Sequence, residues 1–220
     1  MCIRDRMRWN QTYQLYINQY KDLAIREMLQ YRIPASITLA QAVFESGAGR
    51  SRLARLGNNH FGIKCHDWTG RTIAEDDDAL GECFRAYDHP LQSFEDHSKF
   101  LVSSSRYRRL FSLSIQDYRG WAHGLKACGY ATNPRYAYKL IELIELYKLY
   151  VYDSARSYDH AMVEYSGNQT IVNQAKPLHP IAIFNKNYYI RARRGDTFKL
   201  IGEEIGVSYK KIAKYNERDK

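Results

Sequence analysis

The most apolar stretch of the chain is Ser36–Gly49, in which apolar side chains fall on nearly every face of a helix. This pattern is typical of a helix that is buried on all sides. We expect the helix to begin after Pro34, with Ser36 as its cap, and to end at Gly47. A single acid, Glu45, falls in the last turn. Burial and the negative end of the helix dipole both disfavour a carboxylate, so we expect Glu45 to have a raised pKa, as a general acid requires.

Helical periodicity recurs on both sides of this stretch, and strand patterning appears once in the first 153 residues. Further helices are predicted over residues 9–32, 91–104 and 115–127, and from Pro134 onward with Asn133 as the cap, with a short packed element at 107–113. Residues 68–87 are predicted to form a strand, an acidic turn and a second strand. The expected first domain is therefore mainly α, with one small β-hairpin.

The composition changes after residue 153. Residues 154–186 are polar and contain two prolines, which predicts a linker. Residues 187–220 contain a strand, a tight turn and two helical segments, predicted over 197–204 and 209–216. Residues 1–6 fit nothing that follows, and we expect them to be a non-native leader. The expected organisation is a domain over 7–153, the linker, and a small partial module, within a fragment of a longer protein.

The charge limits the possible partners. The chain has 220 residues and a net charge of +9, and residues 186–220 hold ten Lys and Arg against five Asp and Glu. This charge suits nucleic acid, an anionic cell-wall polymer or a membrane surface. The sequence has no nucleic-acid recognition motif, so nucleic acid is disfavoured, and no 18-residue apolar run, so we expect no membrane span. The 19 tyrosines suit carbohydrate surfaces as well as protein cores.

Cysteine and histidine spacing gives little support for a metal site. There is no C-x-x-C pair and no H-E-x-x-H motif, so we expect no metal and no cofactor. Cys65 and Cys83 flank the predicted hairpin. They could form a disulfide, or they could be buried free thiols together with Cys128; the sequence leaves both possibilities open.

Five blocks in order resemble the glucosaminidase family of bacterial autolysins, glycoside hydrolase family 73, which includes the muralytic domain of flagellar rod assembly proteins. The blocks are Gln41–Ser51, Asn58–Lys64, Trp68–Thr72, Phe84–Tyr87 and Gly129–Ala137. The tail resembles a LysM glycan-binding module at Tyr189–Phe198, Ile201–Gly202, Gly206–Ser208 and Ile212–Asn216, without the module's second strand. The resemblance implies a lysozyme-like α+β fold followed by an incomplete LysM unit.

The resemblance also implies roles for particular residues. Glu45 would be the general acid that protonates the leaving sugar. The hairpin acids Asp76, Asp77 and Asp78 share the place of a second carboxylate, although a solvated acidic turn explains them too. Tyr130 and Tyr136 would lie near the cleaved bond.

Four further residues are expected to shape the sugar cleft. They are Asn59, Phe61, Gly62 and Trp68, with the indole of Trp68 as a stacking face for a sugar ring. Tyr136 could instead simply pack on its helix.

The function implied by the resemblance is that of a secreted or envelope-located endo-β-N-acetylglucosaminidase, monomeric, that cleaves the bond between N-acetylglucosamine and N-acetylmuramic acid in peptidoglycan. The alternatives are a muramidase or lytic transglycosylase on the same fold, or a non-catalytic cell-wall-binding scaffold. Inverting, retaining and substrate-assisted routes all stay open, because the separation of the carboxylates is not readable from sequence.

Overall fold

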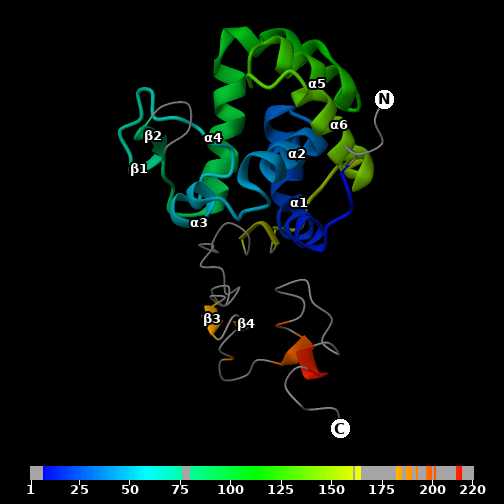
Figure 1. Cartoon of the computed structure of the whole chain (residues 1–220). Coiled ribbons are helices and arrows are strands. Elements are labelled where there is room, and N and C mark those ends of the chain that lie inside the picture. Colours follow the sequence, from blue (N-terminus) through cyan, green and yellow to red (C-terminus); the bar gives the residue numbers. More distant parts are fainter. Residues whose placement is uncertain are drawn as a thin grey trace. The chain divides into compact units, whose positions relative to one another are not determined.

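The computed structural model describes residues 7–75, 80–160, 162–164, 182–184, 187–189, 192, 197–199, 201 and 212–214. The chain divides into two units, Met1–Val172 and Asn173–Lys220. The first unit is mainly helical with one two-stranded sheet, as predicted (Figure 1). Its helices are α1 (Gln11–Tyr31), α2 (Ala35–Ser46), α3 (Arg52–Gly57), α4 (Pro90–Ser103), α5 (Tyr118–Ala127) and α6 (Tyr136–Leu146), with 3-10 segments η2 (Ser105–Ser112) and η3 (Leu149–Ser154).

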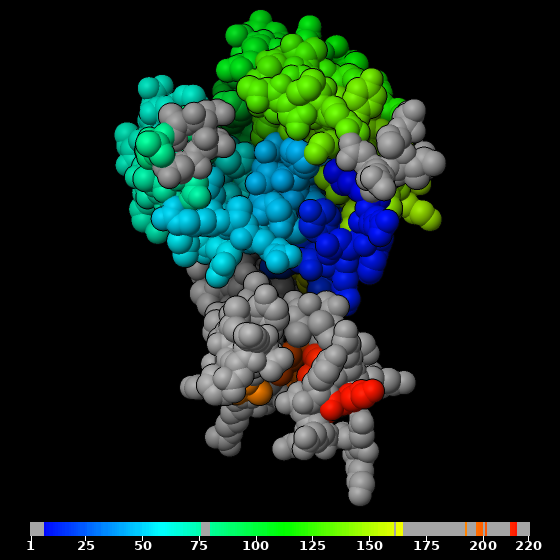
Figure 2. Space-filling view, viewed as in Figure 1, coloured from blue at the N-terminus to red at the C-terminus, as the bar shows by residue number. Residues whose placement is uncertain are grey.

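Helix α2 lies at the centre of the first unit. Every residue from Ala35 to Val43 is buried, and the helix packs against α1, α5, α6 and η3 (Figure 1). In the space-filling view, the light-blue part of the chain that contains the end of α2 reaches the surface between the green helical region and the blue α1 (Figure 2). The predicted buried helix is confirmed, and its carboxyl-terminal end is the part that approaches solvent.

The predicted cap of α2 is wrong. Helix α2 begins at Ala35, so Ser36 lies inside its first turn, and Pro34 at the N-cap position makes no side-chain hydrogen bond to the helix. The carboxylate of Asp153 in η3 takes the capping role: Oδ1 accepts from the Ser36 backbone N–H at 2.8 Å and Oδ2 accepts from Ser36 Oγ at 2.6 Å. The first amide groups of a helix need acceptors, and here a distant segment supplies one.

Two other helix starts differ from the prediction for local reasons. Helix α6 begins at Tyr136, because Asn133 and Pro134 form a turn in which Asn133 Oδ1 accepts the N–H of Arg135 at 2.8 Å. Helix α5 begins at Tyr118, because Asp117 Oδ1 accepts the N–H of Gly120 at 2.9 Å and caps it there.

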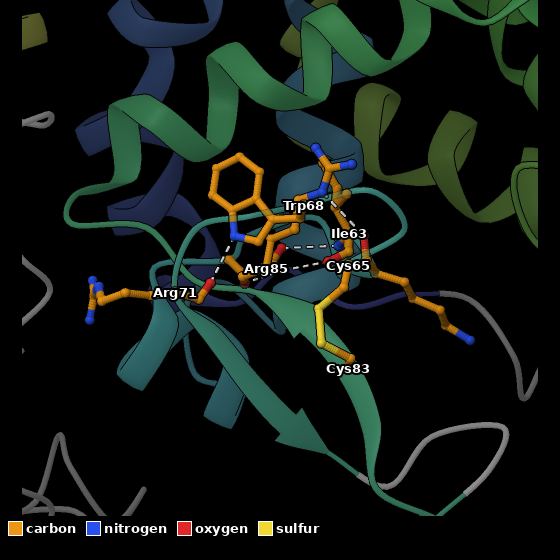
Figure 3. Close-up of a disulfide and its surroundings, with 8 residues drawn as sticks. Ile63, Cys65, Trp68, Arg71, Cys83 and Arg85 are labelled. Atoms are coloured by element: carbon orange, nitrogen blue, oxygen red, sulfur yellow. Dashed lines mark hydrogen bonds between the residues drawn. A yellow bond between two sulfur atoms is a disulfide. The ribbon is translucent and has the colours of Figure 1, made fainter.

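The predicted hairpin is present as β1 (Thr72–Glu75) and β2 (Glu82–Arg85). The two strands are antiparallel, with Ile73 opposite Phe84 and Ala74 opposite Cys83. The other edge of β2 pairs with the preceding segment, since Cys65 N–H donates to Cys83 O at 2.9 Å and Arg85 N–H to Ile63 O at 3.0 Å. A disulfide joins Cys65 to Cys83 beside this pairing, which settles the choice between a disulfide and free thiols (Figure 3). Cys128 is a free cysteine.

An ion pair fastens the hairpin to α4. Arg85 Nη1 donates to both carboxylate oxygens of Asp96, at 3.0 and 2.9 Å, and Tyr87 Oη donates to Asp96 Oδ2 at 2.5 Å. Both side chains of the pair are mostly buried, at 15% and 19% exposure. Asp96 therefore links the end of the sheet to the helical part of the unit.

The first unit continues beyond η3. Asp159 N–H donates to Asp22 Oδ1 at 3.1 Å, and Val163 is buried in the first unit's core. In the second unit, β3 (Ala182–Phe184) and β4 (Asn187–Tyr189) pair antiparallel, so a strand lies within the residues predicted as linker. Of the two helical segments predicted there, 198–199, 201 and 212–214 are described and are helical. No helix in the described ranges is long and apolar enough to cross a membrane.

Candidate active site

Glu45 lies in the last turn of α2, as predicted, and its side chain is half-buried. Gly47 ends the helix in the left-handed conformation, with φ 58°, and its N–H donates to Val43 O. Ser46 is buried and holds the following turn, since its Oγ accepts from the N–H of Gly49 at 2.7 Å. The buried residues on both sides fix the backbone that carries Glu45, so the position of the carboxylate depends on the core of the unit.

Two buried side chains connect to the Glu45 carboxylate through hydrogen bonds. Tyr136 Oη donates to Glu45 Oε1 at 2.8 Å, and Gln41 Nε2 donates to Tyr136 Oη at 3.0 Å. Tyr136 and Gln41 are both 0% exposed. Burial raises the pKa of the Tyr136 hydroxyl well above its ordinary value, and the charge of Glu45 raises it further. Tyr136 therefore keeps its proton and serves as a neutral donor to the carboxylate.

Tyr130 extends the same group of side chains. Its ring stacks on that of Tyr136, with centroids 5.8 Å apart and planes 20° apart, and it is only half-buried. Burial and then the charge of Glu45 raise the pKa of Tyr130 well above its ordinary value. The structure thus brings together Glu45, Tyr130 and Tyr136, three of the residues singled out from the sequence.

A second aromatic layer lies beneath Tyr130. The ring of His97 packs edge-on against Tyr130, with centroids 6.1 Å apart, and stacks on Phe61 at 3.9 Å. Burial lowers the pKa of His97 to about 3, so the ring is neutral at ordinary pH. Phe61 is 4% exposed, which places it in this supporting layer rather than on the surface.

Asn59 and Gly62 shape the turn between α3 and the hairpin. The buried amide of Asn59 donates to Ile63 O at 3.0 Å and Arg85 O at 2.9 Å, and its oxygen accepts from Ile63 N–H at 3.1 Å. Gly62 has φ 63°, a conformation that favours glycine. The Asn59 amide therefore ties the loop to the hairpin backbone, and this placement favours a supporting role for it.

Trp68 lies on the hairpin side, beside a cavity. Its ring rises from the base of the hairpin toward the green helix α4 (Figure 3), and its Nε1–H donates to Arg71 O at 2.8 Å. The cavity between hairpin and helix has a volume of about 630 Å³. It is lined by Trp68, Gly70, Arg71, Ala86, Tyr87, Asp88, Gln92, Glu95, Asp96 and Lys99. The cavity combines an aromatic ring with both signs of charge, which suits a polar ligand that has a flat face.

The predicted second carboxylates lie outside the described residues, which stop at Glu75 and resume at Leu80. Glu75 itself ends β1, directly before the run of three aspartates, and its carboxylate pairs with Arg52. Across the hairpin, Glu82 pairs with Lys64 at 2.9 Å. The acids at the described ends of both strands are therefore bound to basic side chains, while Asp76, Asp77 and Asp78 stay predicted partners of Glu45.

Gln41 and His97 were not among the residues predicted from the sequence to have a role in the site. A polar residue four positions before Glu45 on an otherwise apolar helix was a usable signal for Gln41, because residues four apart share a helix face. Nothing local distinguished His97, since its ring contacts come from other elements. In the part of the chain that is described, no group of three or more His, Cys, Asp or Glu side chains is arranged to hold a metal ion.

The residues around Glu45 lie in a segment that matches a known protein family. The glucosaminidase family model, described as mannosyl-glycoprotein endo-beta-N-acetylglucosaminidase, matches residues 21–149. The exo-glucosaminidase LytG of Bacillus subtilis strain 168 is 33% identical over 137 residues, which is 56% of this chain and 48% of the relative. An autolysin of Enterococcus faecalis is 29% identical over 200 residues, 83% of this chain and 26% of the relative. The chain thus spans about half or less of the length of these relatives.

Solved structures share the fold of the first unit. The catalytic domain of the autolysin Auto from Listeria monocytogenes superposes with a TM-score of 0.55 at 29% identity, covering 66% of this chain and 90% of that domain. A peptidoglycan hydrolase from Sphingomonas sp. A1 also gives a TM-score of 0.55 at 29% identity, covering 67% of this chain and 99% of that chain. These likenesses confirm the predicted lysozyme-like fold class.

Proposed function

The chain belongs to the glucosaminidase family, and from this membership and the surroundings of Glu45 we propose that it is a peptidoglycan hydrolase. In this proposal it acts as an endo-β-N-acetylglucosaminidase, which cleaves the bond between N-acetylglucosamine and N-acetylmuramic acid. The observation that carries the proposal is the hydrogen bond from the buried Tyr136 to Glu45 at the end of the central helix. This hydrogen bond fixes the orientation of the half-buried carboxyl group, and a general acid must be held within reach of the atom that it protonates.

Glu45 protonates the glycosidic oxygen as the bond to the leaving sugar breaks. Tyr136 is fully buried, so it acts on the reaction through Glu45. Tyr130 is half-buried beside it, where its ring can contact a sugar or its N-acetyl group. The two tyrosines therefore have different roles: Tyr136 holds the acid, and Tyr130 faces the substrate.

A second group must complete the reaction at the anomeric carbon. One of Asp76, Asp77 and Asp78 either activates water or stabilises the positive charge, and a substrate acetamido group is the alternative nucleophile. The position of the run, directly after the β1 strand, supports this assignment. Single Asp→Asn variants at 76, 77 and 78 identify the acting residue: the assignment requires one of them to lose activity far more than the other two.

We assign the cavity beside Trp68 to sugar units or stem groups of the substrate. Aromatic rings bind the apolar face of a pyranose, and the charged side chains around this ring are suited to polar substituents. Trp68→Ala is expected to raise KM several-fold while kcat changes little. An unchanged KM excludes Trp68 from substrate binding.

Product analysis tests the bond specificity. Digested peptidoglycan is reduced with borohydride, and the proposed activity labels N-acetylglucosamine ends. Labelled N-acetylmuramic acid identifies a muramidase, and an anhydro-sugar product identifies a lytic transglycosylase; either result overturns the proposal. Because one relative is named an exo-glucosaminidase, glycan length is followed over time: an endo enzyme shortens long strands early, whereas an exo enzyme releases small units from the ends.

The role of Glu45 is tested by Glu45→Gln, which keeps the side chain's shape and removes its acid proton. We expect the rate to fall by about 10²–10⁴, the usual share of a general acid, with the fold kept. Glu142→Gln is the matched control, since that α6 carboxylate accepts the Met7 backbone N–H. If the parent chain is active and Glu45→Gln is equally active, Glu45 is not the acid. If the parent chain itself cleaves no peptidoglycan, the non-catalytic scaffold is favoured.

We also place the protein outside the cell or in the envelope, where its substrate lies, with the tail as a LysM-type wall anchor. The resemblance of residues 189–216 to that module and the basic charge of the tail support this part of the proposal. The test is binding of the inactive Glu45→Gln chain to peptidoglycan sacculi. Competition by chitooligosaccharides is expected if the tail binds N-acetylglucosamine, and undiminished binding in their presence contradicts it.

A further inference from the structure

Gln41 is a polar side chain in the most buried part of the fold. Helix α2 is otherwise rich in apolar residues around it, and Gln41 is 0% exposed. Its Nε2 donates to Tyr136 Oη at 3.0 Å, whereas its Oε1 is buried with no hydrogen-bond partner in the described structure. A buried amide oxygen without a partner destabilises a fold. An apolar residue of the same size would suit the core better, so packing alone does not account for glutamine here.

The hydrogen bonds of the Tyr136 hydroxyl give a reason for this residue. A phenol carries one proton, and its oxygen can accept as well as donate. When Gln41 donates to this oxygen, the proton is directed away from Gln41 and toward Glu45 Oε1, 2.8 Å distant. Gln41 and Glu45 are four residues apart on one helix, so they lie on the same face and Tyr136 spans them from α6.

We propose that Gln41 is a positioning residue for the reaction, which fixes the donor direction of Tyr136 and thereby holds Glu45 in its working orientation. Gln41 acts only through Tyr136 and Glu45 and does not contact the substrate. The proposal rests on the proposed role of Glu45 as the general acid. The two hydrogen bonds that connect Gln41, Tyr136 and Glu45 then have one function. They direct the Tyr136 proton toward Glu45 Oε1 and so hold the carboxyl group in place.

The test compares stability with catalysis in Gln41→Met, a replacement of similar size that lacks the amide. We expect kcat on soluble peptidoglycan strands to fall about five- to tenfold, the share of one hydrogen bond, with KM unchanged. The melting temperature is expected to equal or exceed that of the parent, since an unpartnered buried oxygen is removed. A residue kept for structure alone gives the opposite result, with a lower melting temperature.

Tyr136→Phe and the double variant show whether Gln41 works through Tyr136. Tyr136→Phe alone is expected to lower kcat at least as much as Gln41→Met. Adding Gln41→Met to Tyr136→Phe is expected to change kcat by less than about twofold, because Gln41 acts on Glu45 only through the Tyr136 hydroxyl. Thr38→Val is the matched control. It removes a buried hydroxyl of α2 that has no hydrogen-bond partner among the described residues, and it is expected to keep parent activity.

Each outcome decides the proposal. Parent-level kcat in both Gln41→Met and a second variant, Gln41→Leu, overturns it, as does an equal loss when Tyr136 is already Phe. A loss of activity in Thr38→Val as large as that in Gln41→Met also overturns it, since any disturbance of α2 would then suffice. If Glu45→Gln is as active as the parent, the proposed function fails instead; if Glu45→Gln is inactive and Gln41→Met is not impaired, only this inference fails.

Discussion

The Glu45 end of α2 and the β1–β2 hairpin face the same reaction in our proposal, yet they are held by different interactions. Around Glu45 the supports are buried: the core of α2, the hydroxyl of Tyr136 and the amide of Gln41. The hairpin has only one fully buried side chain on its two strands, Phe84, and is fastened by a disulfide and ion pairs.

This difference predicts different sensitivities. Burial makes the helical side depend on the protonation of groups inside it, because a buried charge is costly. Cross-links make the hairpin depend on redox conditions and on single charged contacts. We therefore expect pH to act on the helical core and reductant to act on the hairpin.

The largest expected effect on stability is that of the disulfide. Removing it in a Cys65→Ser, Cys83→Ser double variant, whose cysteines are 18 residues apart, is expected to lower the free energy of unfolding by about 3 kcal/mol. Hydrogen exchange should quicken in the hairpin while amides of α2 and α6 keep their protection. Cys128→Ser, which removes the free thiol, is the control. Equal loss of protection in α2 would falsify the division into two differently held regions.

The next effect concerns pH and the helical core. Burial raises the pKa of Glu27 to about 7 and that of Asp153 to about 6, whereas burial lowers the pKa of His60 and His97 to about 3. The folded state binds protons at these two acids more tightly than the unfolded state does, so the free energy of unfolding falls as pH rises toward 7. The two buried histidines have the opposite effect. Above the pKa of an unfolded histidine they are neutral in both states, and as pH falls below that pKa the unfolded state gains protons and the free energy of unfolding decreases. The opposed trends predict a nearly flat stability between pH 4.5 and 6.

Glu27→Gln breaks that balance. The parent loses stability as Glu27 deprotonates with rising pH, and the variant does not. The difference in unfolding free energy between variant and parent should therefore increase in favour of the variant from pH 4.5 to pH 7, by an amount on the order of 2 kcal/mol. Urea unfolding at pH 4.5, 6 and 7.5 measures it. A constant difference across these pH values shows that Glu27 does not titrate with a raised pKa.

A smaller effect is expected where the hairpin meets α4. Asp96→Asn removes the charge that binds Arg85 and should cost about 1–2 kcal/mol, because the pair is mostly buried. Glu145→Gln is the matched control: its pair with Arg119 is exposed, and exposed ion pairs contribute little to stability, so a smaller loss is expected. Thermal unfolding distinguishes the two variants, and equal shifts contradict the role given to Asp96.

The smallest effect is expected at the start of α2. Ser36→Ala removes the hydroxyl that donates to Asp153 Oδ2 but keeps the backbone N–H that donates to Oδ1. We expect a loss of about 1 kcal/mol in unfolding free energy, with activity unchanged. If Ser36→Ala has reduced activity but the stability of the parent, the start of α2 affects the site by some means other than the stability of the fold.

The features that the sequence predicted correctly are local. The buried helix, its glycine end and the hairpin follow from periodicity and turn residues within about 20 positions. The features that it missed depend on contacts between distant residues. Gln41 acquires its partner from Tyr136, 95 positions later, and the cap of α2 comes from Asp153, 117 positions after Ser36. The Cys65–Cys83 pairing stayed open for the same reason, since the register of β2 against residues 63–65 decides it.

The Asp153 cap has a consequence for how the protein is made. Domains generally fold as units during synthesis from the N-terminus, at about 5–20 residues per second. Helix α2 leaves the ribosome early, but its first turn lacks its acceptor until residue 153 has also emerged. The helix that carries Glu45 is therefore completed only near the end of the first unit. Nascent chains halted before residue 153 are expected to hold α2 without this cap, and α2 acquires the cap only once residue 153 has emerged.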